Sequence, residues 1–410
     1  MRGAIWIKLF IMMFLEFFIW GAWLPLIFGY LPSLGFSNLQ QSLILNTFPL
    51  AAIVAMFFSN QFADRNFAAQ RFLAFSHLVG GLSILALGWV TTFWPFFLLM
   101  VVHCFFYVPT ISITNSIAFA AMRDAQQEFG IVRMGGTIGW IAASWPFVFL
   151  FEGLEGQQLQ AATTWTYIVA GIASLVLAAF SLTLPHTPPN TAATGEEGLA
   201  WLKTTKLLAV PFVMILWLVT FVDAAVHQSF FSWTGRFLES IGVPGKWIMP
   251  VMSISQFAEI VTMMVLGLFL KRLGWRLTMT LGILGHAARF AVFAFFPQHV
   301  WLVIGINVLH GVCYAFFFAA VYIFVDHYFP KDVRSSAQGL FNVMILGLGP
   351  FFANFVCPPL FDKFVDPATG AVDYQSLFLI PCFSALAAAI VLFLFFHPPA
   401  EEKIELPAQV

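Results

Sequence analysis

A carboxylic acid lies near the middle of one of the most hydrophobic stretches of the chain. The stretch runs from Trp247 to Leu270 and reads WIMPVMSISQFAEIVTMMVLGLFL. It is long enough to cross a bilayer, since about 20 apolar residues span the hydrocarbon layer. Glu259 lies near its centre, and Gln256 and Ser253 precede it at intervals of three residues, on the same helix face. Such a polar stripe marks a pathway through a helix bundle. The alternative is a protonated Glu259 that only bonds a neighbouring helix.

Other apolar runs also carry polar groups that lipid cannot satisfy. In the first run, Glu16 is followed by Trp20 and Trp23 at i+4 and i+7, on one helix face. The fourth run carries a proline and several side chains that can form hydrogen bonds: Tyr107, Pro109, Thr110, Thr114 and Asn115. We therefore expect several helices to enclose a polar site at membrane depth. For the tryptophans, the alternative is packing in the core or against lipid.

The fifth run opens with a cation and an aromatic residue on one face. Arg133, Thr137 and Trp140 follow the i, i+4, i+7 rule. Gly135 and Gly139 lie between them with the spacing that lets two helices approach closely. We expect Arg133, Thr137 and Trp140 to face the polar site. The alternative for Arg133 is an end charge that reaches the membrane surface.

The seventh run carries an acid and an amide. Asp223 and His227 share one face, and Gln228 and Phe231 share a neighbouring face. Asp223 lies deep in its run, which favours a functional role. A structural partner such as His227 or Arg289, which itself needs a partner inside the ninth run, is the alternative.

Three acids lie within predicted spans, and we expect one of them to carry a proton: Glu259 first, then Glu16 or Asp223. Removal from water favours the neutral form of a carboxyl group, so such acids suit coupling to a proton gradient. The tenth run adds His310 and Tyr314 on one face. Taken singly, His227 and His310 are explained as well by packing.

Composition places the chain in the membrane. Of its 410 residues, 60% are hydrophobic and 9% are charged, whereas a soluble domain has about 25% charged residues. The apolar runs are too long and continuous for β-barrel strands. The net charge of -1 indicates no nucleic-acid partner. We expect no catalytic site, cofactor or metal, since no phosphate-binding loop, zinc-protease or hydrolase motif occurs. The four cysteines lie in apolar runs and are expected to be packing residues: Cys104, Cys313, Cys357 and Cys382.

The apolar runs predict an all-α membrane protein with twelve transmembrane helices in two six-helix halves. A polar linker at residues 185–206 separates an N-terminal half, 1–184, from a C-terminal half, 207–410, which ends in a short tail. This arrangement is that of the major facilitator fold. The runs are 5–30, 42–60, 72–91, 96–122, 134–152, 164–184, 207–232, 248–270, 276–296, 299–325, 335–358 and 376–397.

Loop charges predict the orientation, because Lys and Arg accumulate on the cytoplasmic side. With the N-terminus in the cytoplasm, the outer loops carry only Arg236, Lys246 and Lys363, and the remaining loop cations lie inside. Both termini are therefore expected in the cytoplasm.

Several short motifs occur in the order found in one transporter family. They are Phe18-Ile19-Trp20-Gly21-Ala22-Trp23-Leu24, Ala63-Asp64-Arg65, Tyr107-Val108-Pro109-Thr110, Arg133-Met134-Gly135-Gly136-Thr137-Ile138-Gly139-Trp140, Met252-Ser253-Ile254-Ser255-Gln256 with Glu259, Arg289-Phe290-Ala291, and Arg334-Ser335-Ser336-Ala337-Gln338-Gly339. Through them the chain resembles the nucleoside:proton symporter family of the major facilitator superfamily, the bacterial nucleoside permeases. The resemblance covers nearly the whole chain, and the motifs of the fifth and eighth runs are the most specific.

The resemblance implies a nucleoside importer of the bacterial inner membrane, driven by protons. We expect it to be a monomer. It implies that the substrate is held between the halves by polar side chains, with an aromatic ring against the base. That role falls on Arg133, Thr137, Trp140, Gln228, Gln256, Glu259, His310 and Tyr314, and we count Phe231 with them. Phe231 stands where the family has an asparagine, and Ala315 stands where it has an aspartate. The alternatives are a symporter for sugars or other small polar solutes with the same fold, and a polytopic membrane receptor or membrane enzyme.

Overall fold

Helices make up nearly all of the structure. A computed structural model describes residues 2–55, 66–122, 125–189, 206–329 and 334–398. Helices satisfy their own backbone N–H and C=O groups, as lipid requires. In chain order they are α1 (Arg2–Ser33), α2 (Asn38–Leu45), α3 (Thr47–Val54), α5 (Ala69–Ala86), α6 (Phe93–Ala121), α7 (Ala125–Ala142), α8 (Trp145–Leu150), α9 (Gly156–Ala162), α10 (Trp165–Ser181), α12 (Pro211–Ser240), α13 (Gly245–Phe295), α14 (Val300–Ile306), α15 (Val308–Cys313), α16 (Ala320–Tyr328), α17 (Arg334–Asn342), α18 (Gly349–Lys363) and α19 (Tyr374–Phe395).

Nine helical stretches within these ranges are long and apolar enough to cross a bilayer: Ile5–Ser33, Ala69–Trp89, Phe93–Ala121, Gly156–Ser181, Pro211–Ser240, Gly245–Phe295, Val300–Tyr328, Ala337–Lys363 and Tyr374–Phe395. The predicted second span, 42–60, covers the second half of α2, all of α3 and residues 56–60. Residues 56–65, which include the Ala63-Asp64-Arg65 motif, lie outside the described ranges. The predicted fifth span coincides with the end of α7 and with α8. The count of twelve spans therefore remains a prediction.

The stretch α13 contains two of the predicted spans. It has 51 residues, and at about 1.5 Å per residue it is more than twice as long as a bilayer is thick. Its helical geometry breaks at Gly274, where φ is 72° and ψ is 176°. That backbone conformation is accessible to glycine and strained for other residues. The predicted boundary between the eighth and ninth spans, after Leu270, is thus close to the observed break.

The described residues fall into two compact units. The first comprises Met1–Ala193 together with Phe231–Gln256, and the second comprises Thr194–Phe230 together with Phe257–Val410. The division into halves at residues 185–206 remains a prediction, since residues 190–205 lie outside the described ranges.

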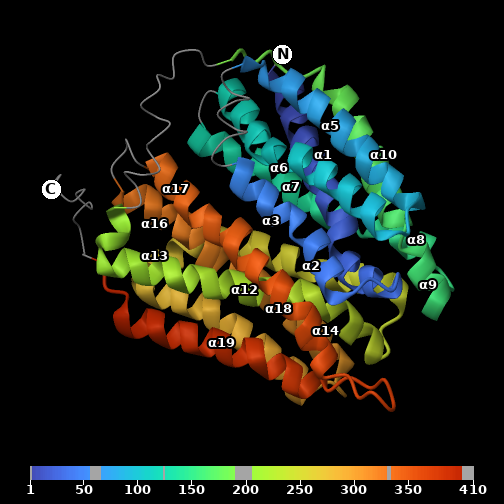
Figure 1. The fold of residues 1–410 in the computed structure, drawn as a ribbon. Coiled ribbons are helices and arrows are strands. Elements are labelled where there is room, and N and C mark those ends of the chain that lie inside the picture. The colour runs from blue at the N-terminus through green and yellow to red at the C-terminus, as the bar shows by residue number, and fades with distance from the viewer. Residues whose placement is uncertain (1, 56–65, 123–124, 190–205, 330–333, 399–410) are drawn as a thin grey trace. The chain divides into compact units, whose positions relative to one another are not determined.

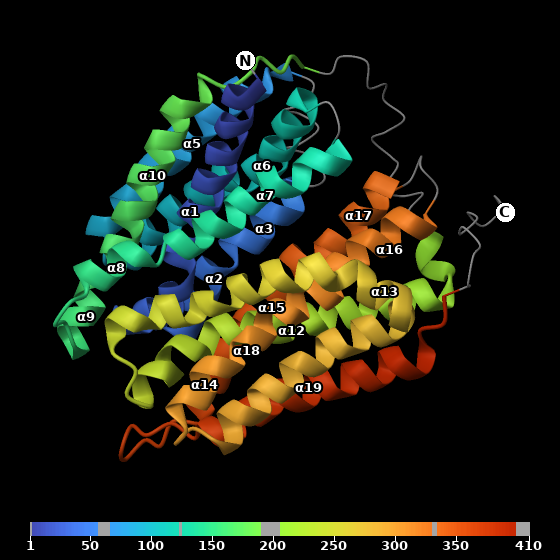
Figure 2. The ribbon, with the colours of Figure 1, turned by 180° about the vertical axis from the view of Figure 1, so that it is seen from behind.

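In the first unit, α1 packs against α7 and α10, and α5 packs against α6 and α10 (Figures 1 and 2). Glycines permit these close approaches. A Cβ atom on Gly139 would collide with the carbonyl group of Phe14 in α1, and one on Gly171 would lie 2.7 Å from Cα of Leu85. The predicted small-residue patch of α7 is therefore confirmed as a helix-packing surface.

The end of α12 and the start of α13 also belong to the first unit. Lys246 forms an ion pair with Glu152, with an N–O distance of 2.6 Å. Leu159 of α9 fills the space beside Gly245, where a Cβ atom would collide with it. These contacts join the hairpin between α12 and α13 to the segment that contains α8 and α9.

In the second unit, aromatic rings join helices that are distant in sequence. The ring centroid of Phe396, just after α19, lies 5.4 Å from that of Phe324 in α16 and 6.2 Å from that of Phe212 in α12. Phe290 of α13 stacks on Phe378 of α19 at 5.7 Å. Two segments are π-helical, Tyr314–Ala319 and Val343–Leu348. Such segments are rare and occur frequently at functional sites.

Candidate functional site

Four aromatic side chains form a continuous cluster in the first unit. Trp20 of α1 stacks on Phe48 of α3 with ring centroids 4.7 Å apart, and it meets Trp140 of α7 edge to face at 5.3 Å. Trp140 in turn lies 6.4 Å from Phe231 of α12. Two of the predicted substrate residues, Trp140 and Phe231, are thereby brought together. We name these four residues, Trp20, Phe48, Trp140 and Phe231, the aromatic cluster.

The aromatic cluster is closely packed. A Cβ atom on Gly21 would lie 3.1 Å from the Trp140 ring. The cavity lined by Gly21, Trp140, Phe231 and Ser253 has a volume of only about 10 Å³, which is about the space of one water molecule. The side chains that line this cavity therefore leave no room between them for a further aromatic ring.

The guanidinium of Arg133 is held against α1. It lies over the ring of Phe17, 4.0 Å from the centroid. Gly136 leaves the space for this arrangement, since a Cβ atom there would be 2.5 Å from Nη1 of Arg133. Thr137 is half-buried one turn further along α7. Arg133 is thus half-buried and packed on an aromatic face, where a cation is stabilised by the ring.

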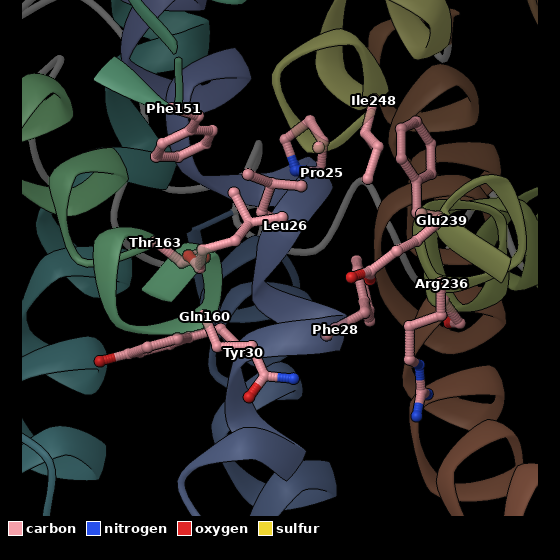
Figure 3. A pocket seen from close by; sticks show the side chains of 16 residues that line it. Pro25, Leu26, Phe28, Tyr30, Phe151, Gln160, Thr163, Arg236, Glu239 and Ile248 are labelled. Carbon is pink, nitrogen blue, oxygen red and sulfur yellow. The ribbon is translucent and has the colours of Figure 1, made fainter. Parts of the chain in front are cut away.

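A larger cavity, of about 130 Å³, lies in the same unit. Figure 3 shows Tyr30, Gln160 and Thr163 on one side of it and Arg236 and Glu239 on the other. Phe231 also lines it. The cavity can hold several water molecules, and it places polar side chains next to the aromatic cluster. These five polar residues are not among the site residues predicted from the sequence, because they lie near predicted loops.

Gln256 and Glu259 both lie in α13, one turn apart. Oε1 of Gln256 accepts a hydrogen bond from the hydroxyl of Ser255 at 2.9 Å, and Gln256 is nearly buried. Glu259 is half-buried. Ser253 donates to the carbonyl of Pro250 at 2.8 Å. The polar stripe predicted from the sequence is therefore present on the helix, and its substrate role remains a prediction.

In the second unit, Gln228 has a buried amide partner. Its side-chain nitrogen donates to the side-chain oxygen of Asn354 at 2.9 Å. Asn354 lies in α18 and is 1% exposed. Asn354 is not among the residues predicted from the sequence, although an asparagine inside the apolar segment FFANFVC is a signal for a buried polar contact. The pair holds the Gln228 amide in one orientation.

His310 and Tyr314 lie beside His227. The His310 ring stacks between His227 and Phe230, with both centroid distances 4.3 Å. Tyr314 lies 6.4 Å from His227 and begins the first π-helical segment. The predicted pair on the tenth span is thus part of one ring assembly with α12.

Asp223, His286 and Arg289 form a buried series of charged and ionisable groups. All three side chains are 0% exposed. Nη2 of Arg289 donates to Nδ1 of His286 at 3.0 Å, and Nε2 of His286 lies 3.7 Å from the Asp223 carboxylate. Arg289 also lies over the ring of Phe230 at 4.2 Å. Arg289 therefore contacts His286 and Phe230, which could not be predicted from the sequence as its partners. Asp223 interacts electrostatically with Arg289.

Glu16 is fully buried in the first unit and hydrogen-bonded on both oxygens. Oε2 lies 2.8 Å from Nε2 of His77, and Oε1 accepts from the hydroxyl of Thr110 at 2.7 Å. His77 was missed in the sequence analysis, although a histidine in the middle of the apolar segment LAFSHLVGG was visible. Both units thus contain a buried carboxylate beside a histidine.

The sequence pattern of the family described as nucleoside H+ symporters matches residues 3–401. Among curated proteins, a putative nucleoside transporter of Escherichia coli K12, YegT, is 31% identical over 97% of this chain and 95% of its own length. The xanthosine permease of the same strain is 29% identical over 98% of both chains. The nucleoside permease NupG is 28% identical over 91% of both.

Solved structures of transporters are also similar to this chain. The crystal structure of a variant of the nucleoside transporter NupG superposes with a TM-score of 0.86 at 25% identity, covering 96% of this chain and 100% of the other. A D-xylose-proton symporter gives a TM-score of 0.74 at 12% identity over 97% of this chain and 99% of the other, a likeness of fold alone. The predicted all-α major facilitator fold is confirmed. The chain belongs to the nucleoside H+ symporter family.

Proposed function

We propose that this protein is a multi-pass membrane transporter that imports nucleosides together with protons by alternating access. The observation that carries the proposal is the family match over residues 3–401. The relatives named as nucleoside and xanthosine permeases supply the substrate class. The aromatic cluster provides flat surfaces for a base. The buried carboxylates are groups that can exchange a proton.

The substrate residues of this proposal are those predicted from the sequence. In the first unit, Trp140 and Phe231 offer flat faces to a nucleobase, and Arg133, Thr137 and Gln256 offer hydrogen bonds. In the second unit, the polar groups are Gln228, Glu259, His310 and Tyr314. Amides and carboxylates suit ribose hydroxyls and base edges. The proposal is supported by the positions of these residues within helices and, for Gln228, by a defined hydrogen-bond partner, Asn354.

Coupling requires a carboxyl group that changes its protonation state in each cycle. Glu259, Glu16 and Asp223 are the candidates, and the sequence places Glu259 first because Gln256 precedes it by one turn. Glu259→Gln keeps the size of the side chain but cannot ionise. If Glu259 carries the proton, this variant exchanges nucleosides across vesicle membranes and has lost gradient-driven accumulation. Uphill accumulation by Glu259→Gln would remove Glu259 from the candidates.

Further parts of the proposal are a monomer in the bacterial inner membrane and two cytoplasmic termini. The four native cysteines form no disulfide and are buried, so an introduced cysteine can be labelled with low background. A cysteine at Thr194, outside the described residues, should be labelled only from the cytoplasmic side. A cysteine at the exposed Thr369 is the matched control, and it should be labelled from outside. The opposite pattern would reverse the proposed topology.

The substrate class is tested by competition. Uptake of labelled uridine into vesicles containing the purified protein is measured with an excess of unlabelled nucleosides, free ribose or xylose. Competition by nucleosides and none by the sugars is the expected result. Competition by ribose alone would favour a sugar symporter of the same fold.

A further inference from the structure

Glu16 of α1 and His77 of α5 form a buried acid–base pair within the first unit. Both side chains are at most 1% exposed, and Oε2 of Glu16 lies 2.8 Å from Nε2 of His77. The family resemblance assigns no role to His77. An imidazole and a carboxylate at this distance share a proton between them, whichever group holds it.

Each end of this pair is in contact with a hydroxyl that has a second acceptor available. Thr110 of α6 lies 2.7 Å from Oε1 of Glu16 and also contacts the backbone carbonyl of Tyr107. Ser174 of α10 lies 3.0 Å from Nδ1 of His77 and 3.1 Å from the backbone carbonyl of His77. Both hydroxyls therefore face one ionisable atom and one atom that can only accept.

A hydroxyl has one proton to donate and lone pairs that can accept. When Oε1 of Glu16 carries no proton, Thr110 donates to it. When Oε1 binds a proton, an O–H bond forms there, the acid donates to Thr110, and the Thr110 hydroxyl turns to the Tyr107 carbonyl. The same exchange operates at the other end, where Ser174 either donates to Nδ1 of His77 or accepts from it and turns to the His77 carbonyl.

The pair can therefore keep its hydrogen bonds in three protonation states without any movement of the helices. In the first, Glu16 is ionised and His77 is neutral. In the second, one proton has been added to either residue. In the third, both have gained one. Only two hydroxyls rotate between these states. A static ion pair that only joined α1 to α5 would not need the two rotatable hydroxyls of Thr110 and Ser174.

The other ionisable groups around the pair come from α6 and α7. On α6, Tyr107 donates to the backbone carbonyl of Glu16 at 2.6 Å, and His103 stacks on Tyr107 at 5.3 Å while Nδ1 of His103 bonds the carbonyl of Gly80. Cys104 interacts electrostatically with Tyr107.

On α7, Arg133 is a permanent cation that also interacts with Tyr107. α10 contributes Ser174 and has no Asp, Glu, Lys, Arg or His between Trp165 and Ser181. α5 has Arg71 in its first turn besides His77, and α1 has Lys8, whose ammonium donates to the carbonyl of Thr183.

We infer that Glu16 and His77, with the hydroxyls of Thr110 and Ser174, form the proton-binding site of the transport cycle. The inference rests on the proposed proton-coupled function for its role in transport. The existence of a titrating Glu16–His77 pair can be tested without any substrate. This inference assigns the coupling proton to the Glu16–His77 pair and not to Glu259.

The chain offers a matched control for the hydroxyl. Thr114 lies one turn after Thr110 on α6, is equally buried, and donates to the carbonyl three residues earlier, Ile111, at 3.0 Å. Thr110→Val and Thr114→Val therefore remove the same group from the same helix, and only Thr110→Val removes a contact to Glu16. Ser174→Ala and Ser181→Ala form a second such pair, since Ser181 is buried and bonds the Leu177 carbonyl.

The first arm is infrared difference spectroscopy of the purified protein between about pH 5 and about pH 8, the range in which imidazole ordinarily titrates. We expect a carboxyl band that changes with pH in the wild type and is absent in Glu16→Gln. Thr110→Val should move its midpoint by about one pH unit, a tenfold change in proton affinity, and Thr114→Val should not. Equal spectra for Thr110→Val, Thr114→Val and wild type would overturn the inference, even if Glu16→Gln fails to fold.

The second arm measures nucleoside exchange and gradient-driven accumulation in vesicles. Glu16→Gln and His77→Gln should retain exchange and lose uphill accumulation, because each removes a proton-binding group of the pair. Thr110→Val should shift the pH dependence of accumulation by about one pH unit, as it shifts the infrared midpoint, and Thr114→Val should leave that dependence unchanged. Full accumulation by His77→Gln, or the same pH dependence in Thr110→Val and Thr114→Val, would contradict the assignment. If the wild type transports no nucleoside while the infrared band behaves as expected, the proposed function fails and the titrating pair stands.

Discussion

The indole rings of Trp20 and Trp140 meet edge to face, with centroids 5.3 Å apart and planes at 81°. This contact joins α1 to α7 at a point where Gly21 leaves room for the second ring. Because Trp20 also stacks on Phe48, movement of either helix relative to the other must rearrange several rings together. The aromatic cluster therefore links the positions of α1 and α7 within the first unit.

Trp140→Ala should weaken nucleoside binding. Stacking of a base on an aromatic side chain contributes about 1–3 kcal/mol, and each 1.4 kcal/mol is roughly a tenfold change in Kd. Trp145→Ala is the control, since Trp145 lies five residues further along the chain, at the start of α8, and is 51% exposed. Titration calorimetry on the purified variants measures both. Unchanged affinity in Trp140→Ala would exclude Trp140 from the binding surface.

The effects of substituting Gln228 and Asn354 on nucleoside binding should not be additive. Loss of either partner removes this hydrogen bond from the amide group that remains, and a typical hydrogen bond contributes about 0.5–1.5 kcal/mol. We expect Asn354→Ala to weaken nucleoside binding through Gln228, and the double variant to bind no worse than Gln228→Ala. Strictly additive effects in this double-mutant cycle would show that the 2.9 Å hydrogen bond does not orient Gln228 for substrate.

Asp223 and Arg289 should stabilise the protein only as a pair. Removing one partner of a buried ionic group typically costs about 3–5 kcal/mol, because it leaves an uncompensated charge. We expect Asp223→Asn and Arg289→Met each to lower the unfolding temperature in detergent, and the double variant to lie well above the value that additivity predicts. A double variant as unstable as the sum of the two would refute the pairing through His286.

Gly139→Ala should destabilise the contact between α1 and α7, since the added Cβ atom would meet the backbone of Phe14. Forcing extra volume into a packed core costs about 1–3 kcal/mol. Gly267→Ala in α13 is the control, because no atom lies within 4 Å of a Cβ there and alanine is the better helix former. Thermal unfolding should separate the two variants. Similar stability for both would show that the glycine contact is not tight.

The all-α membrane fold could be predicted from the sequence because long apolar runs have few other physical solutions. The break near Gly274 was also visible, since basic residues and a glycine interrupt the run there. The broken segments α2 with α3 and α7 with α8 were not visible, because hydropathy records composition and not helix continuity. The place of the stretch Phe231–Gln256 within the first unit depends on packing against α8 and α9, which no local pattern encodes.

The candidate site was predictable only in part. Residues that share a helix face, such as Arg133 and Trp140, follow from spacing. Partners from other helices do not, and the pairs of Glu16 with His77, Gln228 with Asn354, and Arg289 with His286 appear only in the structure. A single histidine or asparagine in an apolar run signals that a partner exists, without naming it.

Proton-coupled nucleoside transport can be measured as the accumulation of labelled uridine in vesicles under an imposed pH gradient. With the acidic side outside, uridine should rise inside the vesicles above its external concentration, and a protonophore should abolish the rise. Vesicles without the protein should show neither effect. Equilibration without accumulation, or accumulation that is indifferent to the protonophore, would contradict the account.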